Sequence, residues 1–326
     1  MYPQNNGQQQ QNNFYQGQQT YTPPEISHTE SPAASILKGL FYVGIFFAAQ
    51  FIISGAFVII VAVSMIAATP GNPAVGENFA ENLQNTVYSY SNHVSALSGI
   101  VTLLFLVIFF LIRRKNPIKE FGFRRIRFSV VILSALTGFT MNFACNILML
   151  LLPQSWIENY MEASAGLSEG SFLSFIIGGV IVAPLVEEII FRSLLLTRLK
   201  RVLRPVLSAL IVAAVFGIAH GDIVWAIYAG SLGLVFCLIF NKFDSVWPSL
   251  IMHFTFNGTS AVLQLVNDAL NVNNMSDEGI VLYNLVFIAI SLLMTAATAV
   301  LITAMLTSKK LNAKKEPMSV CSTSAL

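Results

Sequence analysis

The chain has 326 residues, of which 55% are hydrophobic and only 10% are charged, and its mean hydropathy is +0.68. A soluble domain usually carries about 25% charged residues, so the composition excludes an ordinary soluble protein. It indicates a multi-pass protein of the cell membrane, with the lipid bilayer as its surroundings. The net charge of +2 says little until the charges are mapped, and we expect no nucleic-acid partner.

The N-terminal segment, residues 1–34, is rich in Gln and Asn and has almost nothing apolar to bury. We therefore predict a disordered tail. It is not a signal peptide, because it lacks a basic stretch followed at once by an apolar one. We expect a transmembrane domain over 35–308 and a basic cytoplasmic tail over 309–326.

Eight apolar runs follow the tail, and most reach the roughly 20 residues that a helix needs to cross a bilayer. No short alternating strands appear, so helices are the expected answer. The fold class is therefore all-α, a polytopic transmembrane helical bundle of about eight spans. Seven is the alternative, because the fifth run is short. The runs are 36–68, 95–112, 128–152, 172–197, 207–220, 223–241, 247–267 and 280–307.

The basic residues are placed very unevenly. With eight spans, all but one of the 18 Lys and Arg residues fall in the tails, in the connections on one side or, for Lys38, at the very start of the first run. The opposite connections, 69–94, 153–171 and 268–279, contain no Lys or Arg. The positive-inside rule then puts both termini in the cytoplasm. The basic residue left over is Arg192, inside the fourth run.

Five ionisable residues fall in or at the ends of predicted spans. An ionisable group inside a membrane is costly and marks a functional site by default. Depths estimated from the helical rise of 1.5 Å per residue overlap for the three spans concerned. One buried site built by three helices is therefore geometrically allowed. The residues are Glu187, Glu188, Arg192, His220 and His253.

The spacing around the two glutamates separates their roles. Glu188 and Arg192 are four residues apart, which puts them on one helix face, so we expect an ion pair. Glu187 is rotated by about 100° from Glu188 and is expected to point elsewhere into a cavity. Pro184 would loosen the backbone bonding of this helix and could bend it around the site.

Three short motifs stand in order on three apolar helices: E-E-x-x-x-R from Glu187, F-x-x-x-H ending at His220, and H-x-x-x-N from His253 to Asn257. Together they resemble the CPBP family. This family comprises the type II CAAX prenyl endopeptidases and the bacterial bacteriocin-processing or immunity proteins often called Abi proteins. The resemblance covers roughly residues 170–260, which we take as the protease-like core.

The resemblance implies an intramembrane endopeptidase that cleaves a peptide bond near the end of a membrane-associated or prenylated-protein-like substrate. Carried over to this sequence, Glu187 would be the general base that activates a water, helped by His220. His253 and Asn257 would stabilise the oxyanion, while Glu188 and Arg192 would orient the site. Peptide hydrolysis needs both an activated water and donors aimed at the developing negative charge.

A metal is a second way to activate the water. Two histidines and a glutamate form the ligand set of many catalytic zinc sites, and here they would be Glu187, His220 and His253. The three come from three helices, however, without the H-E-x-x-H pairing of the usual zinc proteases. Zinc and a metal-free, Glu-activated water both fit these residues. We favour the metal-free chemistry and keep zinc open; no other cofactor is expected.

Other functions are weighed against this one. A transporter would need ionisable groups on several other spans, and the first three have none beyond their ends. A non-catalytic bacteriocin-immunity or membrane-binding protein that retains the motif stays open. Ser231 resembles a serine elbow only loosely, and Gly230 and Gly233 beside it are better explained by close helix packing. Asp222 is a candidate to orient the His220 imidazole.

Cysteine placement carries little functional information. Cys145, Cys237 and Cys321 are far apart, which argues against a disulfide framework or a four-cysteine metal site. The first two lie in apolar runs and are expected to be core or lipid-facing thiols.

Overall fold

The computed structural model describes residues 31–68, 75–168 and 171–311. Most of the two predicted tails lies outside these ranges. The first described helix begins at Pro32, so the last three residues of the segment predicted to be disordered are helical. At the other end, Lys309–Leu311 form a single 3₁₀ turn.

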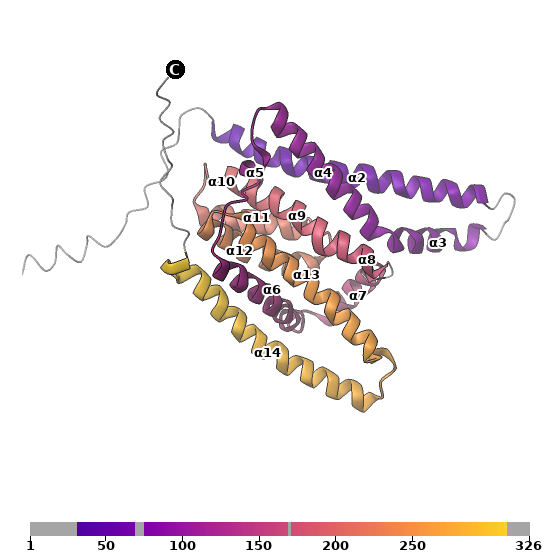
Figure 1. Ribbon diagram of the computed structural model, residues 1–326. Coiled ribbons are helices and arrows are strands. Elements are labelled where there is room, and N and C mark those ends of the chain that lie inside the picture. The colour runs from indigo at the N-terminus through magenta and orange to yellow at the C-terminus, as the bar shows by residue number, and fades with distance from the viewer. Residues whose placement is uncertain (1–30, 69–74, 169–170, 312–326) are drawn as a thin grey trace, which may run out of the picture.

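The described residues form helices and connecting turns, with no strand among them, and this confirms the predicted helical bundle (Figure 1). The α-helices are α2 (Pro32–Ala68), α3 (Val75–Ser89), α4 (Ser91–Ile112), α5 (Pro117–Glu120), α6 (Phe128–Met149), α7 (Gln154–Ser168), α8 (Phe172–Phe175), α9 (Ala183–Glu187), α10 (Thr197–Leu199), α11 (Pro205–Ile218), α12 (Ile223–Phe243), α13 (Val246–Ala269) and α14 (Asp277–Thr307). The remaining elements are the π-helical segments η1 (Ile176–Val182) and η2 (Glu188–Leu196), and the 3₁₀ turns η3 (Val272–Asn274) and η4 (Lys309–Leu311).

All eight predicted apolar runs are helical, but they do not all have the properties of a membrane span. Within the described ranges, six helices are long and apolar enough to cross a membrane. The run predicted as the fifth span, α11, has 14 residues, and α13 is not among the six. The number of spans therefore stays a prediction. The six are Pro32–Ala68, Ser91–Ile112, Phe128–Met149, Phe172–Leu199, Ile223–Phe243 and Asp277–Thr307.

Two segments expected to be loops contain helices. α3 lies within 69–94 and α7 within 153–171, and the two helices pack against each other. Neither contains an apolar run long enough to span a bilayer, so a search for spans passes over them. They lie at the same end of the bundle (Figure 1), where α7 also packs against α12.

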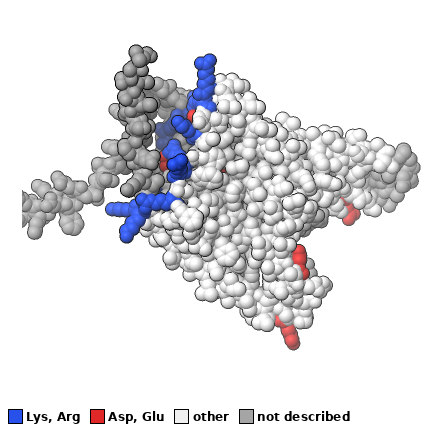
Figure 2. Space-filling view, in the orientation of Figure 1, with Lys and Arg blue, Asp and Glu red and all other residues white. Residues whose placement is uncertain are grey.

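The charged side chains divide between the two ends of the bundle. Figure 2 shows Lys and Arg gathered at one end with a few acidic side chains among them, whereas only acidic side chains are seen at the opposite end. The start of α2 and the end of α14 both lie at the basic end (Figure 1). This distribution supports the expected orientation, in which the basic end faces the cytoplasm. The side on which the termini lie remains a prediction.

The buried core surrounds the fourth predicted span. Every residue of η2 is buried, and its apolar side chains pack with Phe46 of α2, Phe110 of α4 and Phe216 of α11. A second cluster joins α6, α12, α13 and α14 through side chains such as Phe236 and Met252. The ionisable residues lie where these two clusters meet. Cys237 is buried and Cys145 half-buried, as expected.

Candidate active site

The helix that carries both glutamates is irregular on either side of Pro184. The Ala183 N–H bonds the Gly178 carbonyl, five residues back, which is the π pattern. In that pattern the next carbonyl, that of Gly179, would pair with residue 184, and a proline has no N–H to give. Asn257 of α13 supplies the missing donor, because its Nδ2 donates to Gly179 O at 2.7 Å.

The ion pair expected from the spacing is present at the start of η2. Nη1 of Arg192 lies 3.0 Å from Oε1 of Glu188, and both side chains are completely buried. The guanidinium also lies over the ring of Phe216, 4.3 Å from its centroid, and 5.2 Å from that of Phe236. Since a buried charge is stable only when paired, the carboxylate and the two ring faces together hold this cation in place.

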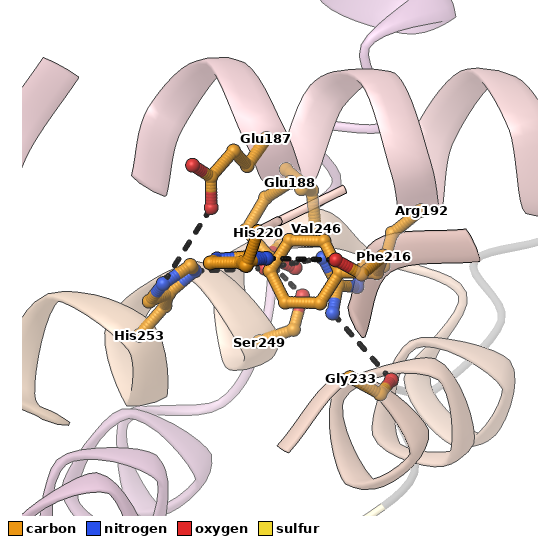
Figure 3. Close-up of polar contacts among 9 residues, drawn as sticks. All are labelled: Glu187, Glu188, Arg192, Phe216, His220, Gly233, Val246, Ser249 and His253. Carbon is orange, nitrogen blue, oxygen red and sulfur yellow. Dashed lines mark hydrogen bonds and ion pairs between the residues drawn. The ribbon is translucent and has the colours of Figure 1, made fainter. Parts of the chain in front are cut away.

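His253 of α13 lies between the two glutamates (Figure 3). Its Nδ1 is 3.1 Å from Glu188 Oε1, and its Nε2 is 3.8 Å from Glu187 Oε2. Glu188 is held ionised by Arg192 and can only accept a hydrogen bond, so Nδ1 carries the proton. Nε2 then faces Glu187. These contacts form a continuous row that begins at a buried cation and ends at a carboxylate. The row consists of Arg192, Glu188, His253 and Glu187.

Glu187 faces open space, unlike its neighbour. Its side chain is 18% exposed, whereas that of Glu188 is 0% exposed. It lines a cavity of about 300 Å³ together with His220. The two adjacent carboxylates therefore point in different directions, as the helical rotation predicts. The other lining residues are Phe46, Phe47, Gln50 and Phe51 of α2, Phe191 of η2, Phe216 of α11, and Ala219.

His220 is oriented by its own helix. At the end of α11 the backbone tightens, and the His220 N–H bonds the Gly217 carbonyl, three residues back. In a regular α-helix this N–H would bond the Phe216 carbonyl. Instead His220 Nδ1 lies 2.7 Å from Phe216 O. A carbonyl only accepts, so Nδ1 carries a proton, and Nε2 remains for chemistry in the cavity.

Asp222, the candidate to orient the His220 imidazole, is engaged with the backbone of the next helix. Its Oδ1 accepts hydrogen bonds from the backbone N–H groups of Val224 and Trp225, at 2.8 and 3.1 Å. It is therefore the N-cap of α12. The turn before it contains Gly221 with φ of +81°, a conformation that glycine adopts readily. The proximity in sequence reflects a helix cap and not a catalytic pair.

The fold thus brings five predicted ionisable residues into one region from α9, η2, α13 and the end of α11. Asn257 is close to this region, but the hydrogen bond that it makes goes to the backbone of η1. Sequence reasoning missed the contribution of α2, which forms much of the cavity wall. Its one available signal is Gln50, the only amide side chain in the run 36–68.

The side-chain arrangement was compared with the zinc ligand set proposed from the sequence. In the part of the chain that the structure describes, no group of three or more His, Cys, Asp or Glu side chains is placed to hold a metal ion. Nδ1 of His220 and Nδ1 of His253 are engaged with Phe216 and Glu188, which leaves Nε2 as the ring nitrogen of each histidine for other partners. Zinc therefore stays the alternative to the metal-free water, and we route no chemical step through a metal.

Comparison with known proteins identifies the region that carries the site. Residues 169–259 match the family model of type II CAAX prenyl endopeptidase Rce1-like proteins. All seven motif positions, from Glu187 to Asn257, lie in this range. The range also agrees with the protease-like core expected from the sequence. This part of the chain is therefore similar to Rce1-like proteins.

A curated protein of Bacillus subtilis (strain 168), named "Putative membrane peptidase YdiL", is 29% identical to this chain over 90 residues. The alignment covers 28% of this chain and 37% of that protein, so the chain spans little more than a third of the relative's length. No solved structure gives a significant match. With the six apolar helices, these findings identify a multi-pass membrane protein whose similarities are to membrane proteases.

Proposed function

We propose that this chain is an intramembrane endopeptidase that uses a water molecule activated by Glu187 and His220. Its substrate would be a membrane-associated or prenylated-protein-like chain, cut near one end. The observation that carries the proposal is that Glu187 and His220 line one cavity of about 300 Å³. Directly behind Glu187, a connected row of His253, Glu188 and Arg192 provides a fixed charge distribution.

The first step is addition of water to the peptide carbonyl. Glu187 takes a proton from a water that also hydrogen-bonds Nε2 of His220, and the water oxygen forms a bond to the carbonyl carbon. The π electrons of the carbonyl move to its oxygen, which becomes an oxyanion. General base catalysis of this kind contributes about 10²- to 10⁴-fold to the rate.

The second step is collapse of the tetrahedral intermediate. The carbonyl re-forms, the carbon–nitrogen bond breaks, and the proton held on Glu187 goes to the departing amine. We assign stabilisation of the oxyanion to His253, whose ring contacts both glutamates. Asn257 is the second candidate donor, through the N–H that it does not give to Gly179.

Glu188 and Arg192 position the other groups and do not react. Both are completely buried and paired with each other. Glu188 fixes the tautomer of His253 by accepting from its Nδ1, as a second group does for the imidazole in many hydrolases. Their contribution is to keep His253 and Glu187 in one geometry while charge moves in the cavity.

The test is cleavage of a quenched peptide library by the purified full-length protein in detergent. Glu187→Gln should lower cleavage by about 10²- to 10⁴-fold, while Glu278→Gln, an exposed site in the first turn of α14, should cleave like the wild type. Equal cleavage by the wild type and Glu187→Gln would overturn the assignment. If the wild type binds library peptides but cleaves none, a non-catalytic binding protein replaces the proposal.

A chelator added to the same assay tests the metal alternative. The metal-free water that we propose predicts unchanged cleavage after extensive dialysis against the chelator. Loss of cleavage that is restored by added Zn²⁺ would instead establish zinc dependence, with Glu187, His220 and His253 rearranged around the ion.

A further inference from the structure

The cavity contains a third polar side chain that the chemistry above does not use. Gln50 of α2 lines it beside Glu187 and His220, and the remaining lining residues are phenylalanines and one alanine. An amide inside an apolar, membrane-embedded wall is costly unless its donors and acceptors are used. The role of Gln50 depends on which of its two ends faces the cavity.

Ser98 of α4 holds one end of this amide. Its hydroxyl oxygen lies 2.6 Å from Gln50 Oε1 and 2.9 Å from the carbonyl oxygen of Ser95. A hydroxyl has one proton, and the Ser95 carbonyl already accepts from the N–H four residues ahead in the helix. The contact to Oε1 is also the shorter of the two, so we place the Ser98 proton toward Oε1. With Oε1 engaged, the group of Gln50 that remains is Nε2, which is a donor.

The position of Ser98 is itself set by the site helix. The next residue, Gly99, is so close to that helix that a Cβ there would lie 2.7 Å from Cγ1 of Val182 and 3.2 Å from Cγ2 of Val186. Val186 immediately precedes Glu187, and Ser98 is completely buried. α4 is thus packed tightly beside the carboxylate, and through Ser98 it fixes Gln50 relative to the catalytic groups.

We infer that Gln50 is a substrate-binding residue whose Nε2 donates a hydrogen bond to a backbone carbonyl oxygen of the peptide in the cavity. This inference rests on the proposed function and adds a residue outside the Rce1-like region. An amide donor suits an extended peptide, because every residue of such a chain offers a carbonyl acceptor. The surrounding phenylalanines leave that carbonyl with few other donors, so the bond selects one register of the substrate.

The experiment measures binding without cleavage. A fluorescently labelled library peptide that the wild type cuts is titrated against the full-length Glu187→Gln protein in detergent, followed by anisotropy. Adding Gln50→Met should weaken binding about tenfold, whereas Ser98→Ala, which only frees the amide, should weaken it less. Gln50→Glu keeps the size and the acceptor for Ser98 but has no donor, and it should also bind more weakly.

Peptide analogues in which single backbone C=O groups are replaced by CH₂ identify the acceptor. One analogue should bind the Glu187→Gln protein weakly, and adding Gln50→Met should weaken its binding no further. The affinity of every other analogue should still fall when Gln50→Met is added. A purely structural bond between α2 and α4 predicts a different result. Gln50→Met and Ser98→Ala would then lower the thermal unfolding temperature alike and leave peptide affinity unchanged, which would overturn the inference.

The failures can be told apart. If the wild type cleaves and Glu187→Gln does not, but Gln50 variants bind every analogue like the parent, only the role of Gln50 is wrong. If neither the wild type nor Glu187→Gln cleaves or binds any library peptide, the proposed function fails and the inference fails with it. Should Gln50→Met not fold, Gln50→Glu in the same titration gives the same decision.

Discussion

Two neighbouring carboxylates on one helix lie in opposite surroundings. Glu188 is sealed between the two apolar clusters and paired with Arg192, whereas Glu187 opens on the cavity. The rotation of about 100° between successive helical residues accounts for the difference. The comparison teaches that adjacent positions of one helix can place one carboxylate in a buried ion pair and the next at a cavity.

The largest effect is expected from a change at the buried carboxylate, Glu188. Glu188→Leu should destabilise the protein by about 3–5 kcal/mol, because it leaves Arg192 buried without its counter-ion, and activity should fall with the folded fraction. The measurement is the free energy of unfolding by a denaturing detergent. Glu188→Leu combined with Arg192→Met removes both charges and should be more stable than Glu188→Leu alone; a double variant no more stable would contradict the ion pair's role.

A change at His220, in the cavity, is expected to lower the rate of cleavage without lowering the stability of the protein. His220→Gln should lower kcat/KM by about 10²- to 10⁴-fold and change the unfolding temperature little, since the ring only completes the bonding of Phe216. His93→Gln is the matched control, because His93 is exposed, lies against Tyr90 and is not among the residues that line the cavity. Full activity of His220→Gln would show that Glu187 activates the water without His220.

A glycine opposite the ion pair sharpens the comparison further. A Cβ on Gly233 would lie 2.9 Å from Cδ1 of Phe216 and 3.4 Å from Nη2 of Arg192. Gly233→Ala should therefore cost about 1–3 kcal/mol of stability through overpacking. In Gly44→Ala the added Cβ meets nothing within 4 Å, so the change should be neutral or stabilising. Thermal unfolding of both variants checks the prediction, which is wrong if the two behave alike.

The last prediction concerns the helix irregularity that presents both carboxylates. Asn257→Leu removes the donor to Gly179 O and should cost about 1–3 kcal/mol. Pro184→Ala restores a backbone N–H at the position that this carbonyl would otherwise use. The pair of changes should therefore cost less than the sum of the single changes in a double-mutant cycle. Strict additivity would mean that Asn257 and Pro184 act independently.

Much of the architecture was predictable because its signals are local. Apolar runs of spanning length identified the helices, and the spacing of Glu188 and Arg192 identified their shared face. The amphipathic helices α3 and α7 were missed, because a helix lacking a long apolar run resembles a polar loop when only spans are sought. The Gln/Asn-rich tail predicted over 1–34 falls mostly outside the described residues.

The candidate site, too, could be predicted only in part from the sequence. Hydropathy selected Glu187, Glu188, Arg192, His220 and His253, because charge inside an apolar run is visible in the sequence. Only the tertiary structure decided their partners: His253 between the two glutamates, Asn257 on Gly179 and Gln50 in the cavity. The physical reason is that a run of residues determines which face of its own helix is polar, while the neighbour that a side chain meets depends on how separate helices pack.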